Sequence, residues 1–231
     1  MKTKKVYEGK SSDGLIARYI NRKLSENLFT PLILRIYKRV TPSQVSVMSF
    51  IISVFGGVAF FLFYPIIGGV LVQLASILDG CDGEIARQKK MASATGNFFD
   101  AFLDRYADFF ILLGVFYYAL IHVANKTLFG IYFGLPLVLV LSVLAIFGIL
   151  MSEYMIQKSI AGLKYELKDH WVSKGRRDFR LFVIFIGGVL TYFSPIFAFI
   201  ALAFVAIETN LKSVGRFILT LRVFQGGNKY E

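Results

Sequence analysis

The sequence predicts an all-α integral membrane protein, in which six transmembrane helices follow an amphipathic helix that lies in the membrane interface. Three observations support this fold class. Of the 231 residues, 56% are hydrophobic, more than is usual in soluble domains. The apolar residues form blocks of about 20, the length that a helix needs to cross about 30 Å of hydrocarbon. Lys and Arg residues are concentrated in segments that six alternating spans place on one side of the membrane.

The N-terminal segment, residues 1–43, is assigned to the cytoplasmic side. Within it, residues 14–39 mix Leu, Ile and Phe with basic residues at helical spacing, as expected for a helix in the membrane interface. A solvated basic tail is the alternative. Charged residues interrupt the segment too often for the apolar core of a signal peptide, so we expect the first span to be retained.

Six spans make up a transmembrane domain at residues 44–215, and a cytoplasmic tail follows at residues 216–231. Strands are disfavoured because the apolar runs are too long and do not alternate. The predicted spans are residues 44–64, 66–89, 95–121, 129–156, 178–193 and 195–214.

Turn signals agree with these boundaries. Thr41-Pro42 is suited to cap and start the first span, and Pro65 separates the first span from the second. Ser194-Pro195 separates the last two spans, which we therefore expect to form a tight helical hairpin.

The basic residues set the expected orientation. Of the 26 Lys and Arg residues, 24 fall on the side that holds both termini, Lys126 falls on the other side and Arg105 lies inside the third span. The positive-inside rule then predicts a multi-pass protein of the cell membrane with both termini and the active site facing the cytoplasm. The net charge of +11 is a signal of topology, and we expect no nucleic acid partner. The single cysteine, Cys81, excludes an intramolecular disulfide and is expected to be a packing residue.

Acidic residues gather in the second and third spans. Inside an apolar span a carboxylate costs at least about 2.5 kcal/mol, so such residues normally mark a cavity, an ion or a proton path. Six of the 15 acidic residues lie in this stretch: Asp79, Asp82, Glu84, Asp100, Asp104 and Asp108.

The spacing of four of these aspartates brings them together. Asp79 and Asp82 are three residues apart and Asp100 and Asp104 are four apart, so each pair shares one helix face, from which Glu84 points away. The short connection predicts that the two helices are antiparallel neighbours, with all four carboxylates at one level in the cytoplasmic half of the membrane. One or two divalent cations would offset their repulsion, and oxygen ligands suit Mg²⁺ or Mn²⁺.

Small and basic residues accompany the aspartates. Ala86 shares the face of Asp79 and Asp82, and Arg87 is suited to a phosphate or to an ion pair with an aspartate. Gly83 and Gly96 remove side-chain bulk where a ligand approaches, although close packing of helices explains them equally well.

The complete pattern is Asp79-x-x-Asp82-Gly83-x-x-Ala86-Arg87, then eight residues, then Gly96-x-x-x-Asp100-x-x-x-Asp104. It resembles in full the signature of the CDP-alcohol phosphotransferase (CDP-alcohol phosphatidyltransferase) family. The six spans and the preceding interfacial helix also resemble this family, so the similarity covers essentially the whole chain. One departure lies at the first span, where many relatives have Thr-Pro-Asn and this chain has Thr-Pro-Ser, with Ser43 as the third residue.

The resemblance implies that a phospho-alcohol group is transferred from a CDP-alcohol to the hydroxyl of a second alcohol, with release of CMP. It implies that Asp79, Asp82, Asp100 and Asp104 bind a pair of Mg²⁺ or Mn²⁺ ions, and that Asp104 is also the general base. It further implies a homodimer in the lipid bilayer. The implied CDP pocket consists of five signature residues: Asp82, Gly83, Ala86, Arg87 and Gly96.

Within the family, the phrases LDGCDGEIARQKK, FLDRYAD, GRRDFRLF and DGLIARYINRKLS are most similar to di-myo-inositol phosphate phosphate synthases. That similarity implies CDP-inositol as donor, inositol 1-phosphate as acceptor and a separate cytidylyltransferase that supplies the donor. A phosphorylated acceptor requires fixed positive charge, although topology alone also explains basic residues beside a cytoplasmic span. The candidates stand at the entrance to the fifth span: Lys174, Arg176, Arg177 and Arg180.

Two other functions stay open. The first is phospholipid synthesis from CDP-diacylglycerol or CDP-archaeol with inositol phosphate, serine or glycerol phosphate. The second is a divalent-cation transporter, which leaves the glycine, alanine and arginine positions unexplained. Two further acidic residues have open roles: Asp108 is suited to orient a metal ligand or to pair with Arg105, and Glu153 is expected to emerge at the membrane interface rather than face the polar cavity.

Overall fold

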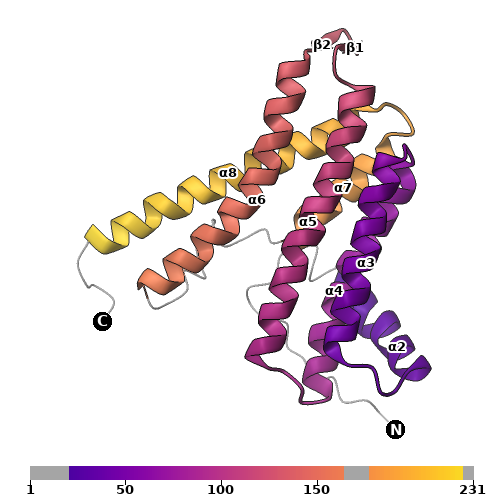
Figure 1. Cartoon of the computed structure of the whole chain (residues 1–231), viewed down its shortest axis with the longest axis vertical. Coiled ribbons are helices and arrows are strands. Elements are labelled where there is room, and N and C mark those ends of the chain that lie inside the picture. The colour runs from indigo at the N-terminus through magenta and orange to yellow at the C-terminus, as the bar shows by residue number, and fades with distance from the viewer. Residues whose placement is uncertain (1–20, 164–176, 226–231) are drawn as a thin grey trace.

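The computed structural model describes residues 21–163 and 177–225, and these are mostly helical (Figure 1). Six long helices make up this part of the chain, as the sequence predicts. They are α3 (Pro42–Phe61), α4 (Pro65–Gln88), α5 (Ala94–His122), α6 (Leu135–Leu163), α7 (Arg177–Leu190) and α8 (Ile196–Gln225).

Helical residues also precede the bundle. α1 (Arg22–Leu24), the π-helical turn η2 (Ser25–Phe29) and α2 (Thr30–Ile36) follow one another directly and pack against α4. This stretch falls within the helix predicted at 14–39, whose first residues lie outside the described part of the chain. Its apolar side chains Leu28, Leu32 and Ile36 are exposed, which suits contact with lipid.

The opposite side of this N-terminal helix is polar and faces Glu84 of α4. The Ser25 hydroxyl donates a hydrogen bond to Glu84 Oε1, and the Thr30 hydroxyl donates to Glu84 Oε2 at 2.5 Å. Asn21 donates to the Ser76 hydroxyl at 2.9 Å. Glu84 therefore points away from the other acidic residues, as its spacing predicts. Its two hydrogen bonds hold the N-terminal helix against α4.

The predicted turn signals act at the helix ends. Thr41 caps α3 through a reciprocal pair of hydrogen bonds with Gln44, and Pro65 is the first residue of α4. The Ser93 hydroxyl accepts the Gly96 amide at the start of α5. α7 and α8 form the predicted helical hairpin, since only residues 191–195 separate them.

The predicted start of the fourth span, residue 129, is wrong. A small antiparallel hairpin, β1 (Lys126–Leu128) and β2 (Ile131–Phe133), occupies this position, and α6 begins only at Leu135. Phe129 and Gly130 both have positive φ, the conformation that the favoured two-residue hairpin turns require. An apolar run predicted to be helical thus begins as a turn.

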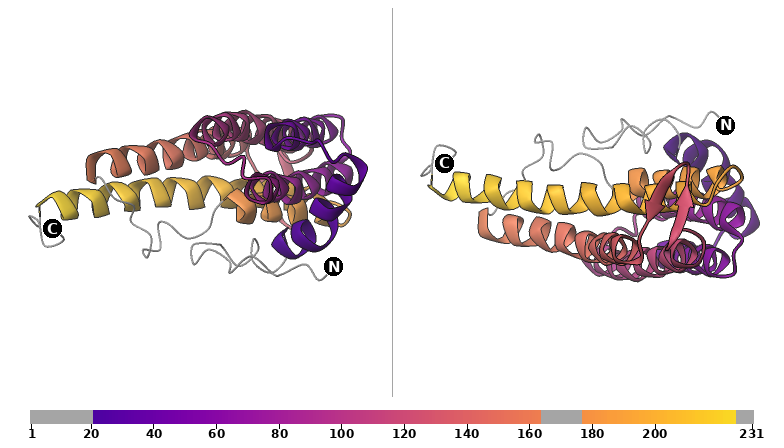
Figure 2. Two further views of the ribbon diagram at one scale, coloured as in Figure 1. Left: turned by 90° about the horizontal axis from the view of Figure 1, so that it is seen from below. Right: turned by 90° about the horizontal axis from the view of Figure 1, so that it is seen from above.

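α3 links the two helices that carry the aspartates. α3 packs against both α4 and α5, α7 packs against α4, and α6 pairs with α8. Figure 1 and Figure 2 show α6 and α8 crossing each other, with their C-terminal ends reaching away from the other helices. α4 and α5 make little contact with each other, although we expected them to be neighbours. α3 joins them instead, because it packs against both.

Four of the described helices are long and apolar enough to cross a membrane: α3, α4, α6 and α8. The protein is therefore a multi-pass membrane protein. α5 carries four charged side chains in its first half, and the 14 residues of α7 span about 21 Å at 1.5 Å per residue. That α5 and α7 also cross the membrane, as the prediction of six spans requires, thus remains a prediction.

Two glycines set the distance between α3 and α5. A Cβ atom added at Gly114 of α5 would lie 2.0 Å from the carbonyl oxygen of Gly57, and one added at Gly57 would lie 2.3 Å from the carbonyl oxygen of Phe110. The two backbones touch directly, as small residues allow in membrane helix pairs.

We expect Gly114→Ala to destabilise the protein by about 1–3 kcal/mol, the usual cost of forcing an extra carbon into a packed interface. Thermal unfolding in detergent, followed by loss of the monodisperse chromatographic peak, measures the effect. Gly134→Ala is the control, because its added Cβ would meet no atom closer than 3.6 Å. Equal melting temperatures for the two variants would contradict the prediction.

Candidate active site

Three aspartates from two helices meet in the space between α4 and α5. One carboxylate oxygen each from Asp79, Asp82 and Asp100 lie within 4.8 Å of one another. Three such groups repel strongly in a low dielectric, and a divalent cation would offset that repulsion. The ligands are all oxygen, which fits Mg²⁺ or Mn²⁺.

Asp82 is held by a side chain of the third helix around the site. The Ser46 hydroxyl of α3 donates to Asp82 Oδ2 at 2.5 Å, and Asp82 is buried. α3 thus fixes the orientation of a carboxylate on α4. Sequence reasoning missed Ser46, because a lone serine in an apolar span gives no distinctive signal.

Asp104 joins the group through Arg177, the first residue of α7. Arg177 Nη1 lies 2.7 Å from Asp104 Oδ1 and 3.1 Å from Asp79 Oδ1. Arg177 Nε lies 2.8 Å from Oδ1 of Asp108, which is 2% exposed. The structure therefore places Arg177 among the aspartates, whereas the sequence suggested an acceptor-binding residue. Two further candidates of that group of four, Lys174 and Arg176, lie outside the described residues.

A second charged cluster adjoins the first and consists of Arg105, Glu153 and Arg180. Glu153 Oε1 lies 3.3 Å from Arg105 Nη1 and 3.7 Å from Arg180 Nη2. Arg105 Nη2 is also 3.8 Å from Asp108 Oδ2 and 3.9 Å from Asp104 Oδ2. The expectation that Glu153 emerges at the interface is wrong, because it faces two arginines from α5 and α7.

Arg180 is the most enclosed member of this second cluster. Only 3% of it is exposed, and its Nε and Nη2 atoms have no hydrogen-bond partner within the described part of the chain. A buried guanidinium with unused donors is suited to bind an anion. Arg105 was not among the predicted site residues, although a basic residue in the middle of an apolar span was a usable signal.

The remaining signature residues lie toward the ends of α4 and α5. A Cβ atom added at Gly83 would lie 3.2 Å from Arg87 Nη1, so the Arg87 side chain extends over this glycine. Ala86 is half-buried one turn beyond Asp82, and Gly96 stands one turn before Asp100. Both helices thus present a face of small side chains beside their carboxylates.

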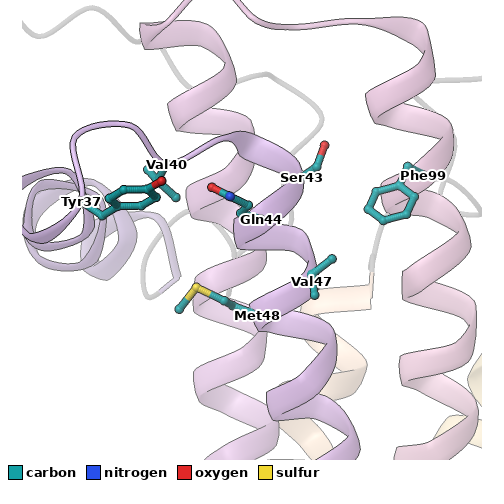
Figure 3. A pocket seen from close by; sticks show the side chains of 7 residues that line it. All are labelled: Tyr37, Val40, Ser43, Gln44, Val47, Met48 and Phe99. Atoms are coloured by element: carbon teal, nitrogen blue, oxygen red, sulfur yellow. The ribbon is translucent and has the colours of Figure 1, made fainter.

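An apolar cavity of about 490 Å³ opens next to this site (Figure 3). Phe99 on its wall directly precedes Asp100 in α5, and Ser43 precedes Ser46 by one turn of α3. Its lining residues come from the loop after α2, from α3 and from α5: Tyr37, Val40, Ser43, Gln44, Val47, Met48 and Phe99.

The sequence model of one family, described as CDP-alcohol phosphatidyltransferase, matches residues 39–211. The chain belongs to this family. Membership confirms the resemblance and the predicted class of enzyme, a transferase acting on CDP-alcohols, and it favours this class over a cation transporter.

Two curated members of the family are similar along most of the chain, and both are named bifunctional IPC transferase and DIPP synthase. The protein from Archaeoglobus fulgidus is 35% identical over 203 residues, which are 85% of this chain and 36% of the relative. The protein from Aquifex aeolicus is 31% identical over 206 residues, which are 87% of this chain and 43% of the relative. The chain therefore spans less than half the length of these two relatives.

Solved structures share the fold. Two crystal structures of Mycobacterium tuberculosis phosphatidylinositol phosphate synthase superpose with a TM-score of 0.67 at 19% identity, covering 87% of this chain and 93% and 89% of theirs. One has CDP-DAG bound, and the other is in complex with manganese and citrate. At this identity the likeness establishes the arrangement of helices alone.

Proposed function

We propose that this CDP-alcohol phosphatidyltransferase transfers phospho-inositol from CDP-inositol to inositol 1-phosphate, giving di-myo-inositol phosphate phosphate and CMP. The observation that carries the proposal is the meeting of the signature aspartates across α4 and α5. Three have oxygens within 4.8 Å of one another, and Arg177 joins the fourth to Asp79. The names of the two curated relatives support the choice of inositol substrates.

In the proposed reaction the acceptor hydroxyl oxygen attacks the phosphorus that carries the donor inositol. A new phosphorus–oxygen bond forms, the pyrophosphate bond breaks, and CMP departs with the bridging oxygen. The acceptor proton passes to a carboxylate oxygen of Asp104, which acts as general base. Arg177 of α7 fixes the position of Asp104 through Oδ1, at 2.7 Å, and also contacts Asp79 of α4.

Asp79, Asp82, Asp100 and Asp104 would hold a pair of divalent cations, Mg²⁺ or Mn²⁺. When bound, such cations neutralise charge on the pyrophosphate. Support comes from the all-oxygen ligand set and from the manganese complex of the mycobacterial synthase. In the proposed CDP pocket, Gly83 and Gly96 leave room for the nucleotide and Ala86 adds little bulk. Arg87 pairs with a phosphate of the donor. Asp82 borders both the cation site and the CDP pocket.

The acceptor phosphate is assigned to the second charged cluster. Arg180 offers two buried nitrogen atoms that lack a hydrogen-bond partner among the described residues, and Arg105 adds a second guanidinium. Arg105 lies beside Asp104 and Asp108, and Glu153 links it to Arg180. A phosphate bound to these two arginines would bring the acceptor hydroxyl toward Asp104. Glu153 holds the two guanidinium groups together.

A second candidate function is phospholipid synthesis from CDP-diacylglycerol or CDP-archaeol. The specific observation in its favour is the apolar cavity beside Phe99, which is suited to hold part of a lipid chain close to the aspartates. The mycobacterial synthase with CDP-DAG bound, which shares this fold, points the same way.

CMP release separates the two candidates. Purified protein with Mg²⁺ receives CDP-inositol and inositol 1-phosphate in one reaction, and CDP-diacylglycerol with inositol phosphate in another. We expect release in the first alone, and its abolition by a chelator such as EDTA. Release in the second alone would establish the lipid reaction instead, and silence in both would contradict both substrate assignments.

The cellular setting follows from the same proposal. The enzyme would span the cell membrane six times, with both termini and the active site in the cytoplasm, and would act as a homodimer. A cytidylyltransferase would supply CDP-inositol from the cytoplasmic side. The basic residues of the inner segments support this orientation.

A further inference from the structure

We propose that Arg177 is a positioning residue that holds Asp79 and Asp104 together and gives way to the second divalent cation, so that the two cations bind in a fixed order. This inference rests on the two-cation site of the proposed function. It concerns the order of loading, which the signature residues alone do not determine.

The contacts divide the acidic cluster into two parts. The Asp79, Asp82 and Asp100 oxygens approach within 4.8 Å of one another, a spacing that one cation can bridge. Asp104 stands on the other side of Arg177, whose Nη1 lies between Asp104 Oδ1 at 2.7 Å and Asp79 Oδ1 at 3.1 Å. A cation that joins these same two oxygens needs the space that Nη1 fills, because Mg²⁺ binds oxygen at about 2.0–2.1 Å.

Electrostatics also favours binding of the first cation at Asp79, Asp82 and Asp100, before a second cation binds between Asp79 and Asp104. The first divalent cation enters among three carboxylates, and Arg177 leaves most of their negative charge unpaired. A second cation beside a retained guanidinium would place two positive groups within a few ångströms of each other in a low dielectric. The second cation therefore binds only as Arg177 withdraws, and its affinity is reduced by the free energy needed to break the Arg177 contacts.

Asp108 provides the place to which Arg177 withdraws. Its Oδ1 already accepts from Arg177 Nε at 2.8 Å. Its Oδ2 is buried, lies 3.8 Å from Arg105 Nη2 and has no hydrogen-bond partner in the described residues. A small rotation of the guanidinium about its Nε contact would direct a second N–H at this oxygen, giving the two parallel hydrogen bonds that arginine and carboxylate form preferentially. Arg177 can thus release Asp79 and Asp104 and remain paired.

Titration with Mn²⁺ in the absence of substrate tests the proposal. Full-length protein in detergent is titrated while free Mn²⁺ is followed by electron paramagnetic resonance, which yields both binding constants. We expect the wild type to bind one Mn²⁺ at least about tenfold more tightly than the second. Arg177→Gln should strengthen the second binding step by about tenfold or more and change the first by less than about threefold.

Two further variants complete the test. Arg222→Gln is the control: it removes an exposed arginine from the last turn of α8, which belongs to neither charged cluster, and it should leave both constants unchanged. Arg177→Lys keeps the charge but has a single nitrogen, so it should strengthen the second step by a smaller factor and serves if Arg177→Gln fails to fold. Normal Mn²⁺ binding with an unchanged or weaker second step in the Arg177 variants overturns this inference alone. Absence of Mn²⁺ binding in all variants overturns it together with the proposed metal site.

Discussion

Replacing Asp104 with asparagine should lower kcat for CMP release by about 10³-fold or more. The amide cannot accept the acceptor proton, and it is a poorer ligand for a divalent cation, so two contributions to the reaction are lost together. Asparagine has nearly the same size as aspartate, and the bundle should therefore remain folded. We expect CDP-alcohol binding to be partly retained, since the residues assigned to the nucleotide lie elsewhere on α4 and α5.

The measurement is CMP release at saturating donor and acceptor, together with donor binding to the same preparation. Glu208→Gln is a suitable control, because Glu208 is a carboxylate of the bundle that pairs with Lys212, one turn along the same helix, α8. Near-normal turnover of Asp104→Asn would reject Asp104 both as general base and as cation ligand.

The second large effect is expected for Arg180→Gln, which should raise the acceptor KM about 10- to 150-fold and leave the donor KM nearly unchanged. Hydrogen bonds to a charged group contribute about 1.5–3 kcal/mol, which corresponds to this range. The selective change in KM distinguishes loss of acceptor binding from general damage. Arg180 is the residue to test because its buried nitrogen atoms lack hydrogen-bond partners in the described chain.

Two comparisons make this prediction specific. Arg222→Gln removes an exposed arginine from the far end of α8 and should change neither KM. Unphosphorylated inositol, offered as acceptor, should react equally slowly with the wild type and with Arg180→Gln. An acceptor KM for inositol 1-phosphate that is unchanged in Arg180→Gln would show that the buried guanidinium has another role.

Local sequence patterns account for most of the helices and for the core of the site. The order and approximate positions of the helices follow from apolar runs, and Thr41 and Pro65 act at helix starts through contacts within a few residues. The pairs Asp79 with Asp82 and Asp100 with Asp104 share a face because of helical periodicity alone. These features depend on neighbours close in the chain, and the sequence is sufficient to predict them.

The errors and omissions have a different physical origin. The turn at Phe129 and Gly130 depends on backbone angles that an apolar run does not reveal. Ser46 reaches Asp82 because α3 packs between α4 and α5, and Glu153 meets Arg105 and Arg180 only where α6 passes the other two helices.

Helical periodicity and residue spacing were enough to predict a helical membrane protein with two pairs of aspartates, each pair on one helix face, because both are local properties of the chain. The class of enzyme came from the resemblance of this signature to a known family. The position of Arg177 among the aspartates, with Arg180 beside them, is a consequence of tertiary packing. These two arginines are three residues apart on one helix and look alike in the sequence. Their different partners depend on the depth and rotation at which α7 packs against α4, and these are set by contacts between segments about 100 residues apart.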